Sequence, residues 1–287
     1  MEYRYRLRMR KTAAGLIRAS HPEPAVAVTA AAVLLAIGVG HGVTGVIAVA
    51  VAVLSSQLAV GWVNDWLDAN RDRLVGRTDK PIAAGVIPRR TVGLAGLLAA
   101  IATPALALAS GGPAAIAATV GLISALLYNW PLKSTPFSVV PYMFSFAMLP
   151  TFVVLALPGS PAPPAWLVAA GALLGGGGHF ANALPDLADD ARTGVRGLPH
   201  RLGPTGSAVA AATLLVAATV VLAFGPPGPP SPGGVAAVAL AALVLPLGWY
   251  AGRLALARGT RPVGLFRAVM AVAVIDVVLL VASGTVV

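Results

Sequence analysis

The 287-residue sequence contains no cysteine, so it can form neither disulfides nor thiolate metal sites, and its redox compartment stays open. Charge is also scarce: Asp, Glu, Lys and Arg make up 10% of the residues, whereas a soluble domain carries about 25%. Apolar residues make up 57%, and the mean hydropathy is +0.84. The composition therefore predicts an integral membrane protein.

Long uncharged runs lead to the same conclusion, because a helix needs about 20 apolar residues to cross a bilayer. We predict an all-α, polytopic fold with nine transmembrane helices in one domain, residues 1–287. The predicted spans are 25–40, 43–64, 91–110, 113–131, 138–157, 164–184, 205–224, 233–252 and 263–283. A basic segment, 1–24, precedes them, and two long polar loops, 65–90 and 185–204, connect spans at the same membrane face.

The formal net charge of +10 could suggest a nucleic-acid partner, but the distribution of charge indicates membrane topology. With nine spans, all 20 Lys and Arg residues fall on one side, and the loops near residues 41, 111, 160 and 229 carry none. The positive-inside rule makes that side cytoplasmic, in a multi-pass protein of the cell membrane. Segment 1–24, with Arg4, Arg6, Arg8 and Arg10, is expected to lie against anionic head groups, or to act only as a topology signal.

The two long loops contain a repeat. Both copies read Asn-x3-Asp-x3-Asp-x3-Gly-x4-Pro-x3-Gly, and they lie 118 residues apart without a gap. The copies are Asn64, Asp68, Asp72, Gly76, Pro81 and Gly85, and Asn182, Asp186, Asp190, Gly194, Pro199 and Gly203. An even number of spans separates them, so we expect a parallel repeat with both copies on the same face.

Spacings of four place each Asn and its two Asp residues on one stripe of a helix. Carboxylates four residues apart repel each other, and a bound cation relieves that repulsion. Because all the ligands are oxygens, the candidates are Mg²⁺, Mn²⁺ and Ca²⁺. Mg²⁺ commonly takes one or two carboxylates plus substrate phosphates, which suits two acidic stripes sharing a diphosphate.

The alternative is that these acids are solvated, or pair with Arg71, Arg73 or Arg192; two copies in register argue against it. Asp65 and Asp189 stand off the shared stripe and could support the site or only be solvated. A diphosphate also needs cations, since its oxygens carry more charge than a metal alone neutralises. Five basic residues fall on the correct face, each equally explained as a topology charge: Arg77, Lys80, Lys133, Arg196 and Arg201.

These motifs resemble those of the UbiA-type superfamily of intramembrane prenyltransferases. NDWLDANRD at 64–72, followed by RTDKPIAAG at 77–85, is similar to the first Asp-rich motif of that family. ANALPDLADDARTGVRGLPHRLG at 181–203 is similar to the second, and YNWPLK at 128–133 to the Tyr and Lys segment between them. The resemblance implies a helical bundle around a central cavity that opens to lipid, with the two polar loops as a cytoplasmic cap.

The resemblance also implies roles for individual residues. Mg²⁺ and an isoprenoid diphosphate are expected at Asn64, Asp68, Asp72, Asp186 and Asp190, with the four aspartates as catalytic residues. Lys80, Lys133 and Arg196 stand at the basic positions of the family and are expected to bind the diphosphate, although Lys80 stands where Arg is commoner. Arg77 is expected to do so because it lies on the same face. The substrate pocket is expected to involve Tyr128, His179, Asn182 and Asp65.

Several of these residues have a simpler explanation. Tyr128 could be an interfacial anchor at a span end. His21 and His179 are expected to make ordinary polar contacts. The glycines 175–178 could leave room for a prenyl tail, but close helix packing is the favoured reading. Asp276 lies in the middle of a span, where an acid is costly and usually functional, and its role is open.

The leading hypothesis is an enzyme, a prenyltransferase that transfers an alkyl group other than methyl. It would move a prenyl group from an isoprenoid diphosphate to a lipophilic acceptor, with an aromatic compound as the expected class, through an Mg²⁺-assisted allylic carbocation. The runner-up is a membrane terpene cyclase that uses no acceptor, and a transporter is a remote third. The sequence does not specify prenyl chain length, acceptor, pathway or oligomeric state.

Overall fold

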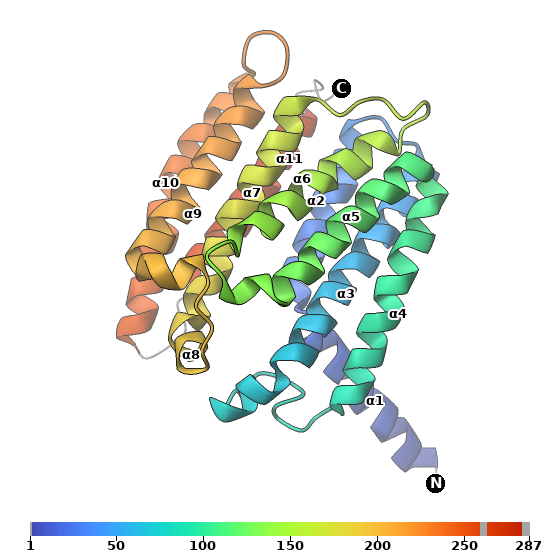
Figure 1. Ribbon diagram of the computed structural model, residues 1–287. Coiled ribbons are helices and arrows are strands. Elements are labelled where there is room, and N and C mark those ends of the chain that lie inside the picture. Colours follow the sequence, from blue (N-terminus) through green and yellow to red (C-terminus); the bar gives the residue numbers. More distant parts are fainter. Residues whose placement is uncertain (1, 259–262, 283–287) are drawn as a thin grey trace.

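Residues 2–258 and 263–282 are described by a computed structural model in which helices form all the regular secondary structure (Figure 1). The N-terminal half holds α1 Glu2–Ala19, α2 Pro22–Gly38, α3 Val43–Leu74, α4 Arg89–Ala107, α5 Gly112–Asn129 and α6 Val139–Leu155. The C-terminal half holds α7 Ala165–Ala183, α8 Leu187–Arg192, α9 Leu198–Phe224, α10 Pro232–Ala257 and α11 Gly264–Ala282. Three short 3₁₀ turns are η1 Leu108–Ser110, η2 Leu132–Ser134 and η3 Leu184–Asp186. The predicted all-α membrane fold is confirmed.

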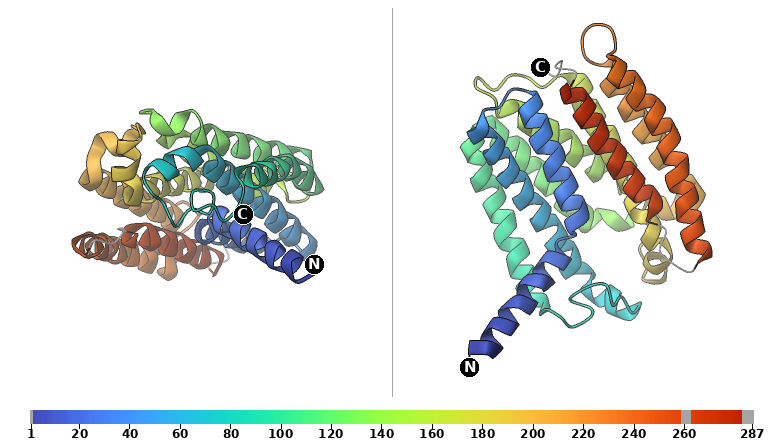
Figure 2. Two further views of the ribbon diagram at one scale, coloured as in Figure 1. Left: turned by 90° about the horizontal axis from the view of Figure 1, so that it is seen from below. Right: turned by 180° about the vertical axis from the view of Figure 1, so that it is seen from behind.

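The long helices pack as a ring. From α2 to α7 each helix contacts the next, α7 contacts α9, and α11 packs back on α2 to close the ring. Contacts of α3 with α5, α2 with α6 and α7 with α11 also reach across it, so side chains fill part of the interior. The end view in Figure 2 shows the helices side by side around this interior. The predicted central cavity stays a prediction.

The predicted count of nine spans is not confirmed, although a helix occupies each predicted segment. Seven helices are long and apolar enough to cross a membrane within the described residues. The exceptions are α2 and α6, each of 17 residues and therefore about 25 Å long, against a hydrocarbon core of about 30 Å. α2 passes the test only together with Lys11–Ala19, across a bend of 65°. The last predicted span ends at residue 283, which lies outside the described residues.

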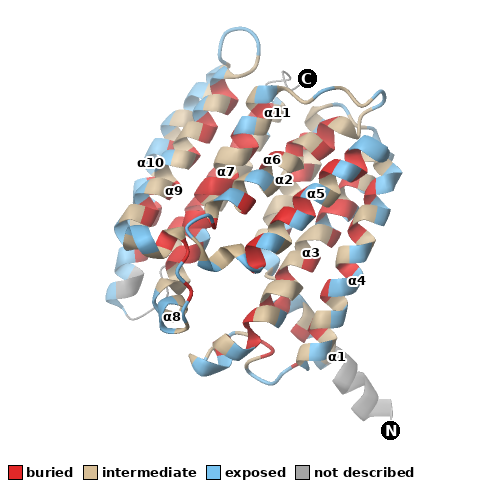
Figure 3. Cartoon of the chain, viewed as in Figure 1, coloured by how far each residue is buried: buried red, intermediate tan, exposed pale blue. Residues whose placement is uncertain are grey.

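Figure 3 shows exposed residues along the outer helices. Many of these residues are apolar, as lipid contact requires. Leu94, Leu97 and Leu98 of α4 and Leu243 and Leu247 of α10 are all more than half exposed. Conversely, Asp65, Asp68 and Asp72 are buried, at 1%, 6% and 9% exposure. In a water-soluble protein the leucines would be buried and the aspartates exposed. The buried aspartates of α3 are therefore candidates for a functional site.

The 32-residue helix α3 explains where its acids lie. At 1.5 Å per residue it is about 48 Å long, so it extends well beyond the apolar thickness of a bilayer. Asn64, Asp68 and Asp72 occupy its last three turns. The prediction of a loop over 65–90 is therefore wrong in its first part: residues 65–74 continue the helix, and the loop itself covers 75–88.

The glycine run 175–178 of α7 lies mostly where this helix packs closely against its neighbours. A Cβ on Gly175 would lie 2.6 Å from Cβ of Phe146 and 2.6 Å from the carbonyl oxygen of Tyr142, both in α6. Gly176 and Gly177 likewise face α6 and α9, whereas a Cβ on Gly178 would meet no atom within 4 Å. Most of this run therefore brings helices together, as favoured from the sequence.

Replacing Gly175 with alanine should lower the stability by about 1–3 kcal/mol, because a backbone carbonyl cannot move aside for the new methyl group. Gly178→Ala is the matched control in the same helix and should leave stability unchanged or slightly raised. Thermal unfolding of both variants in one detergent measures the difference. Equal losses would show that the α6–α7 contact is not the cause.

Candidate active site

The two copies of the sequence repeat form the same backbone turn. The N–H of Arg77 donates to the carbonyl of Asp72 at 2.9 Å, and the N–H of Val195 donates to the carbonyl of Asp190 at 2.9 Å. Both turns pass through a glycine with positive φ, 72° at Gly76 and 84° at Gly194. Glycine adopts this conformation without steric cost and commonly ends helices in this way. The repeat is thus a pair of matching helix ends, each carrying an aspartate in its last turn.

The first stripe centres on Asp68, which is held by two cations. Lys133 Nζ donates to Asp68 Oδ2 at 2.7 Å, and Arg71 forms a short ion pair with Asp68 Oδ1. Asn64 Nδ2 lies 3.4 Å from Asp68 Oδ2 and 3.4 Å from Asn129 Oδ1. The alternative pairing of an acid with Arg71 is therefore seen for Asp68, and Lys133 reaches it from η2.

The second stripe departs from the predicted single helix. Asn182 lies in α7, Asp186 at the end of η3 and Asp190 in α8, because the 3₁₀ turn at Leu184–Asp186 interrupts the helix next to Pro185. The predicted loop 185–204 is correspondingly wrong in part, since α8 and the first turns of α9 lie within it. Nε2 of His200 lies 3.8 Å from Asp190 Oδ2, a contact that is an ion pair only when the imidazole is protonated.

Arg77 connects the two stripes. Its Nη1 donates to Asp186 Oδ1 at 3.0 Å, while Nε and Nη2 donate to the two oxygens of Asp79 at 2.8 and 2.7 Å. Burial alone would lower the pKa of Arg77, but its bonds to Asp79 and Asp186 outweigh burial and raise that pKa. Arg77 therefore stays cationic beside the second stripe, with its planar donors already ordered.

Lys133 lies between the stripes. In addition to its ion pair with Asp68, it is near enough for its charge to act on Asp190. Its side chain is 15% exposed. Arg77 and Lys133 thus bring positive charge between the two groups of carboxylates, as expected for a site that binds a polyanion.

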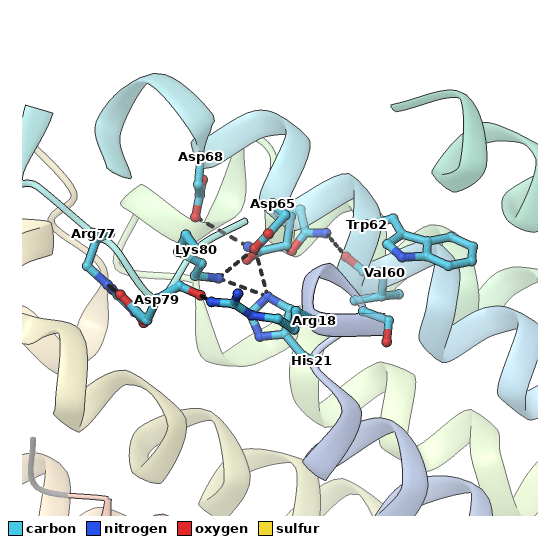
Figure 4. A network of polar contacts seen from close by, with 12 residues as sticks. Arg18, His21, Val60, Trp62, Asp65, Asp68, Arg77, Asp79 and Lys80 are labelled. Atoms are coloured by element: carbon cyan, nitrogen blue, oxygen red, sulfur yellow. Dashed lines mark hydrogen bonds and ion pairs between the residues drawn. The ribbon is translucent and has the colours of Figure 1, made fainter. Parts of the chain in front are cut away.

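Lys80 makes its close contacts away from Asp68. Its Nζ donates to Asp65 Oδ1 at 2.6 Å and lies 2.9 Å from Nε2 of His21, which is itself 3.1 Å from Asp65 Oδ1 (Figure 4). His21 has the polar contact expected from the sequence. The arrangement assigns Asp65 to the support of Lys80 and His21, and a role of either Asp65 or Lys80 in contact with substrate stays a prediction.

An aromatic cluster lies next to the acids. The ring of Tyr128 is 4.6 Å from that of Tyr142 and 5.4 Å from that of His179, both edge to face. Asn182 Nδ2 donates to the hydroxyl of Tyr142 at 3.3 Å, and His179 Nε2 lies 3.1 Å from the hydroxyl of Ser138. Tyr128 is near enough to Asp68, Asp186 and Asp190 for their charges to interact electrostatically with its hydroxyl group. The predicted pocket residues Tyr128, His179 and Asn182 are therefore together, beside the two stripes.

Arg196 is placed apart from these contacts. It lines a pocket of about 400 Å³ with His200 and Arg201 at the start of α9. Among the described residues, no carboxylate forms an ion pair with Arg196. Its predicted role in binding diphosphate is not supported by a contact with either stripe and stays a prediction.

The acidic residues suit a hard divalent cation only with help from substrate. Across the described parts of the chain, no three His, Asp or Glu side chains are placed to hold one metal ion together. The buried carboxylate of Asp72 makes no hydrogen bond or ion pair to another described side chain. A buried carboxylate without a partner is costly, and a cation bound by one or two carboxylates plus phosphate oxygens would remove that cost. The oxygen-only donors fit Mg²⁺ in this form.

Asp276 belongs to a different part of the bundle. Thr219 Oγ1 donates to its Oδ2 at 2.7 Å, and Oδ1 has no hydrogen-bond partner. The residue lines a cavity of about 60 Å³ that is closed by the loop 225–231. That loop joins α9 and α10 at the end opposite to α8 in Figure 1. Asp276 therefore takes no part in the candidate active site.

Sequence reasoning missed Tyr142, Asp79 and Asn129. Asn129 lies within YNWPLK at 128–133, but the prediction for that segment used only its Tyr and Lys. Tyr142 lies outside every motif, in an apolar helix, and its contacts depend on how α5 and α6 pack. Asp79 gave a usable signal, because an acid two residues from Arg77 on a loop can pair with it.

Comparison with known proteins agrees with this fold. Residues 25–275 match the UbiA prenyltransferase family. The digeranylgeranylglyceryl phosphate synthase of Methanopyrus kandleri is 29% identical over 219 residues, which are 72% of this chain and 80% of that protein. The 33 kDa chain of bacteriochlorophyll synthase from Cereibacter sphaeroides is 32% identical over 184 residues, 59% of either chain.

A solved structure shows the same architecture. The UbiA homologue from Archaeoglobus fulgidus bound to GPP and Mg²⁺ has a TM-score of 0.65, with 93% of this chain and 99% of that chain covered. The identity of 16% limits this likeness to the fold. The family match, in contrast, extends over most of the sequence and includes both acidic stripes. The chain therefore belongs to the UbiA prenyltransferase family and is a prenyltransferase.

Proposed function

We propose that this enzyme transfers a prenyl group from an isoprenoid diphosphate to a lipophilic, aromatic acceptor, and that the transfer depends on Mg²⁺. The observation that carries the proposal is the pair of matching acidic helix ends, with Arg77 and Lys133 between them. The similarity of the fold to a structure with bound GPP and Mg²⁺ supports the same donor class.

The candidate ligands of Mg²⁺ are the carboxylates of Asp68, Asp72, Asp186 and Asp190 and the amide oxygen of Asn64. Mg²⁺ held by one or two of these carboxylates together with diphosphate oxygens would neutralise charge on the diphosphate. Arg77 and Lys133 would donate hydrogen bonds to the same diphosphate oxygens. The allylic C–O bond breaks and both electrons leave with the diphosphate. An acceptor carbon then bonds to the allylic carbon, and the acceptor loses a proton.

The aromatic cluster has two tasks in this reaction. The faces of Tyr128 and Tyr142 can stabilise the allylic cation, as aromatic rings stabilise other cations. The buried ring of Tyr128 and the half-buried ring of Tyr142 also keep water from the cation, which would otherwise be hydrolysed. Asn182, by its bond to the Tyr142 hydroxyl, would fix the position of that ring.

We place the active site on the cytoplasmic face. The loops 75–88 and 184–197, and the turn at Leu132–Ser134, lie at the same end of the bundle (Figure 1). These segments contain five of the 20 Lys and Arg residues, and α1, which leaves the bundle at the same end, contains six more. Cytoplasmic loops of membrane proteins are rich in Lys and Arg. Labelling of single introduced cysteines from either side of sealed vesicles tests this orientation.

The activity is tested with the purified protein in lipid nanodiscs, labelled geranyl diphosphate, Mg²⁺ and a set of lipophilic phenols. We expect diphosphate release together with a phenol product heavier by one geranyl group. Reactions without phenol separate this function from cyclisation. A cyclic hydrocarbon formed at full rate without acceptor would contradict the proposed transfer and identify a cyclase.

A further inference from the structure

The N-terminal helix α1 is packed against the loop 75–88, here called the cap loop. Arg18 Nη2 donates to the carbonyl of Asp79 at 3.0 Å (Figure 4). A Cβ on Gly15 would lie 3.0 Å from Cβ of Ile87. A buried cluster joins Ala19 to Ile82 and Ile87, with Leu16 packed against it. The second half of α1 therefore supports both ends of the cap loop.

The direction of α1 is fixed by its junction with α2. The helix segment Lys11–Ala19 meets α2 at 65°, with His21 in the left-handed region at φ 53°. Trp62 Nε1 donates to the carbonyl of Leu16 at 2.9 Å, and a Cβ on Gly61 would approach the carbonyl of Ser20 to 2.5 Å. With these contacts α1 is held against α3 at an angle to the bundle, and its first half extends away from the other helices (Figure 2).

The charge of α1 suits an anionic lipid surface. Its sequence contains Arg4, Arg6, Arg8, Arg10, Lys11 and Arg18, against one acid, Glu2. Tyr3, Tyr5 and Leu7 alternate with these cations, and aromatic and apolar residues next to Arg are typical of segments that lie in the membrane interface. α1 leaves the bundle at the end where the cap loop and α8 lie, which is the face richest in positive charge.

The cap loop connects α1 to the candidate active site. Arg77 of this loop binds Asp186 of the second stripe, and Lys80 binds Asp65 of α3. Asp79, whose carbonyl accepts the bond from Arg18, also holds the guanidinium of Arg77 through its carboxylate. A chain of three contacts therefore joins α1 to the second stripe: Arg18 binds Asp79, Asp79 binds Arg77, and Arg77 binds Asp186.

We propose that α1 binds the anionic head groups of the bilayer and thereby holds the cap loop in the position that places Arg77 at the second stripe. Anionic lipid would then be an activator of the enzyme. The readout rests on the proposed function, because activation is measured as diphosphate release. Arg18 and the residues of α1 are positioning residues and do not touch substrate.

The test compares nanodiscs of phosphatidylcholine with nanodiscs that also contain phosphatidylglycerol. Geranyl diphosphate is the probe, and kcat and KM are determined in each lipid. We expect the wild type to have a several-fold higher kcat/KM in the mixed lipid. The variant Arg8→Gln with Arg10→Gln should lose most of this activation, because each cation near an anionic surface contributes about fivefold to attachment, and two together about 25-fold. The matched control removes two exposed arginines elsewhere, Arg253→Gln with Arg258→Gln, and should keep it.

A cross-link separates positioning from a general effect of lipid. Because the natural sequence has no cysteine, Gly15→Cys with Ile87→Cys introduces a single possible disulfide, at a Cβ separation that needs a shift of a few tenths of an ångström. Oxidation should make the enzyme equally active in both lipids, and reduction should restore the dependence.

Three results would overturn the inference: equal wild-type activity in the two lipids, activation retained after loss of Arg8 and Arg10, or lipid dependence retained in the cross-linked protein. A wild type that releases no diphosphate in either lipid would instead contradict the proposed function. Thermal unfolding of each variant in the neutral lipid confirms that it is folded.

Discussion

Replacing Asp186 with asparagine should reduce the rate of diphosphate release by about 100-fold or more, the loss typical of removing one electrostatic group from a reacting centre. Asparagine keeps the shape of the side chain and an oxygen that can accept from Arg77, but it removes the negative charge that attracts the cation and the Arg77 guanidinium. The rate should fall mainly through kcat, since the charge on the diphosphate grows as the C–O bond breaks. Stopped assays with labelled geranyl diphosphate measure both parameters.

The matched control is Asp189→Asn, three residues along the chain. Asp189 lies off the repeated stripe and forms a long ion pair with Arg192 at 3.8 Å. Its loss removes the same charge from α8, the short helix that directly follows Asp186, so it reports any general effect on the electrostatic potential. Equal losses at Asp186 and Asp189 would show that net charge matters and that the stripe does not.

Removal of Mg²⁺ should abolish the reaction. Among the described residues, no three His, Asp or Glu side chains are placed to hold one metal ion, and Mg²⁺ commonly binds one or two carboxylates together with phosphates. We therefore expect the ion to bind together with the diphosphate. A chelator should therefore stop diphosphate release completely, and added Mg²⁺ should restore it within the mixing time. Mn²⁺, which favours similar oxygen ligands, should restore part of the rate.

The order of addition distinguishes this picture from a resident structural metal. Chelator should leave the thermal unfolding temperature of the substrate-free enzyme unchanged. In the presence of a non-ionising diphosphate analogue, Mg²⁺ should raise it, because a ligand that binds only the folded state stabilises that state. Release of diphosphate that continues at full rate in chelator would contradict the metal dependence.

The sequence alone predicted the features that depend on local pattern. The repeat predicted two equivalent structures 118 residues apart, and the structure shows the same hydrogen bond after Asp72 and after Asp190. Gly76 and Gly194 are equivalent because both turns need positive φ. The resemblance to the UbiA family rested on these same residues, and the family is confirmed.

Features that depend on packing could not be predicted in this way. The contacts of Lys80 with Asp65 and His21 were not predicted, because they depend on the bend after α1 that brings His21 to the loop. The role of Lys80 at the diphosphate stays a prediction. Tyr142 is one aromatic residue in an apolar helix, and only the packing of α5 on α6 shows that it faces Tyr128. The count of spans was uncertain for a related reason: hydropathy locates α2 and α6 but does not determine how a 17-residue helix crosses the bilayer.

The central claim is that the two acidic stripes act on one diphosphate, and a double-mutant cycle between Asp68→Asn and Asp186→Asn tests it most directly. If both groups stabilise the same departing diphosphate, removing the second after the first should cost much less than its removal from the wild type. The double variant should then release labelled diphosphate almost as fast as the slower single variant. Losses that multiply would mean that Asp68 and Asp186 act independently, and would contradict a shared site.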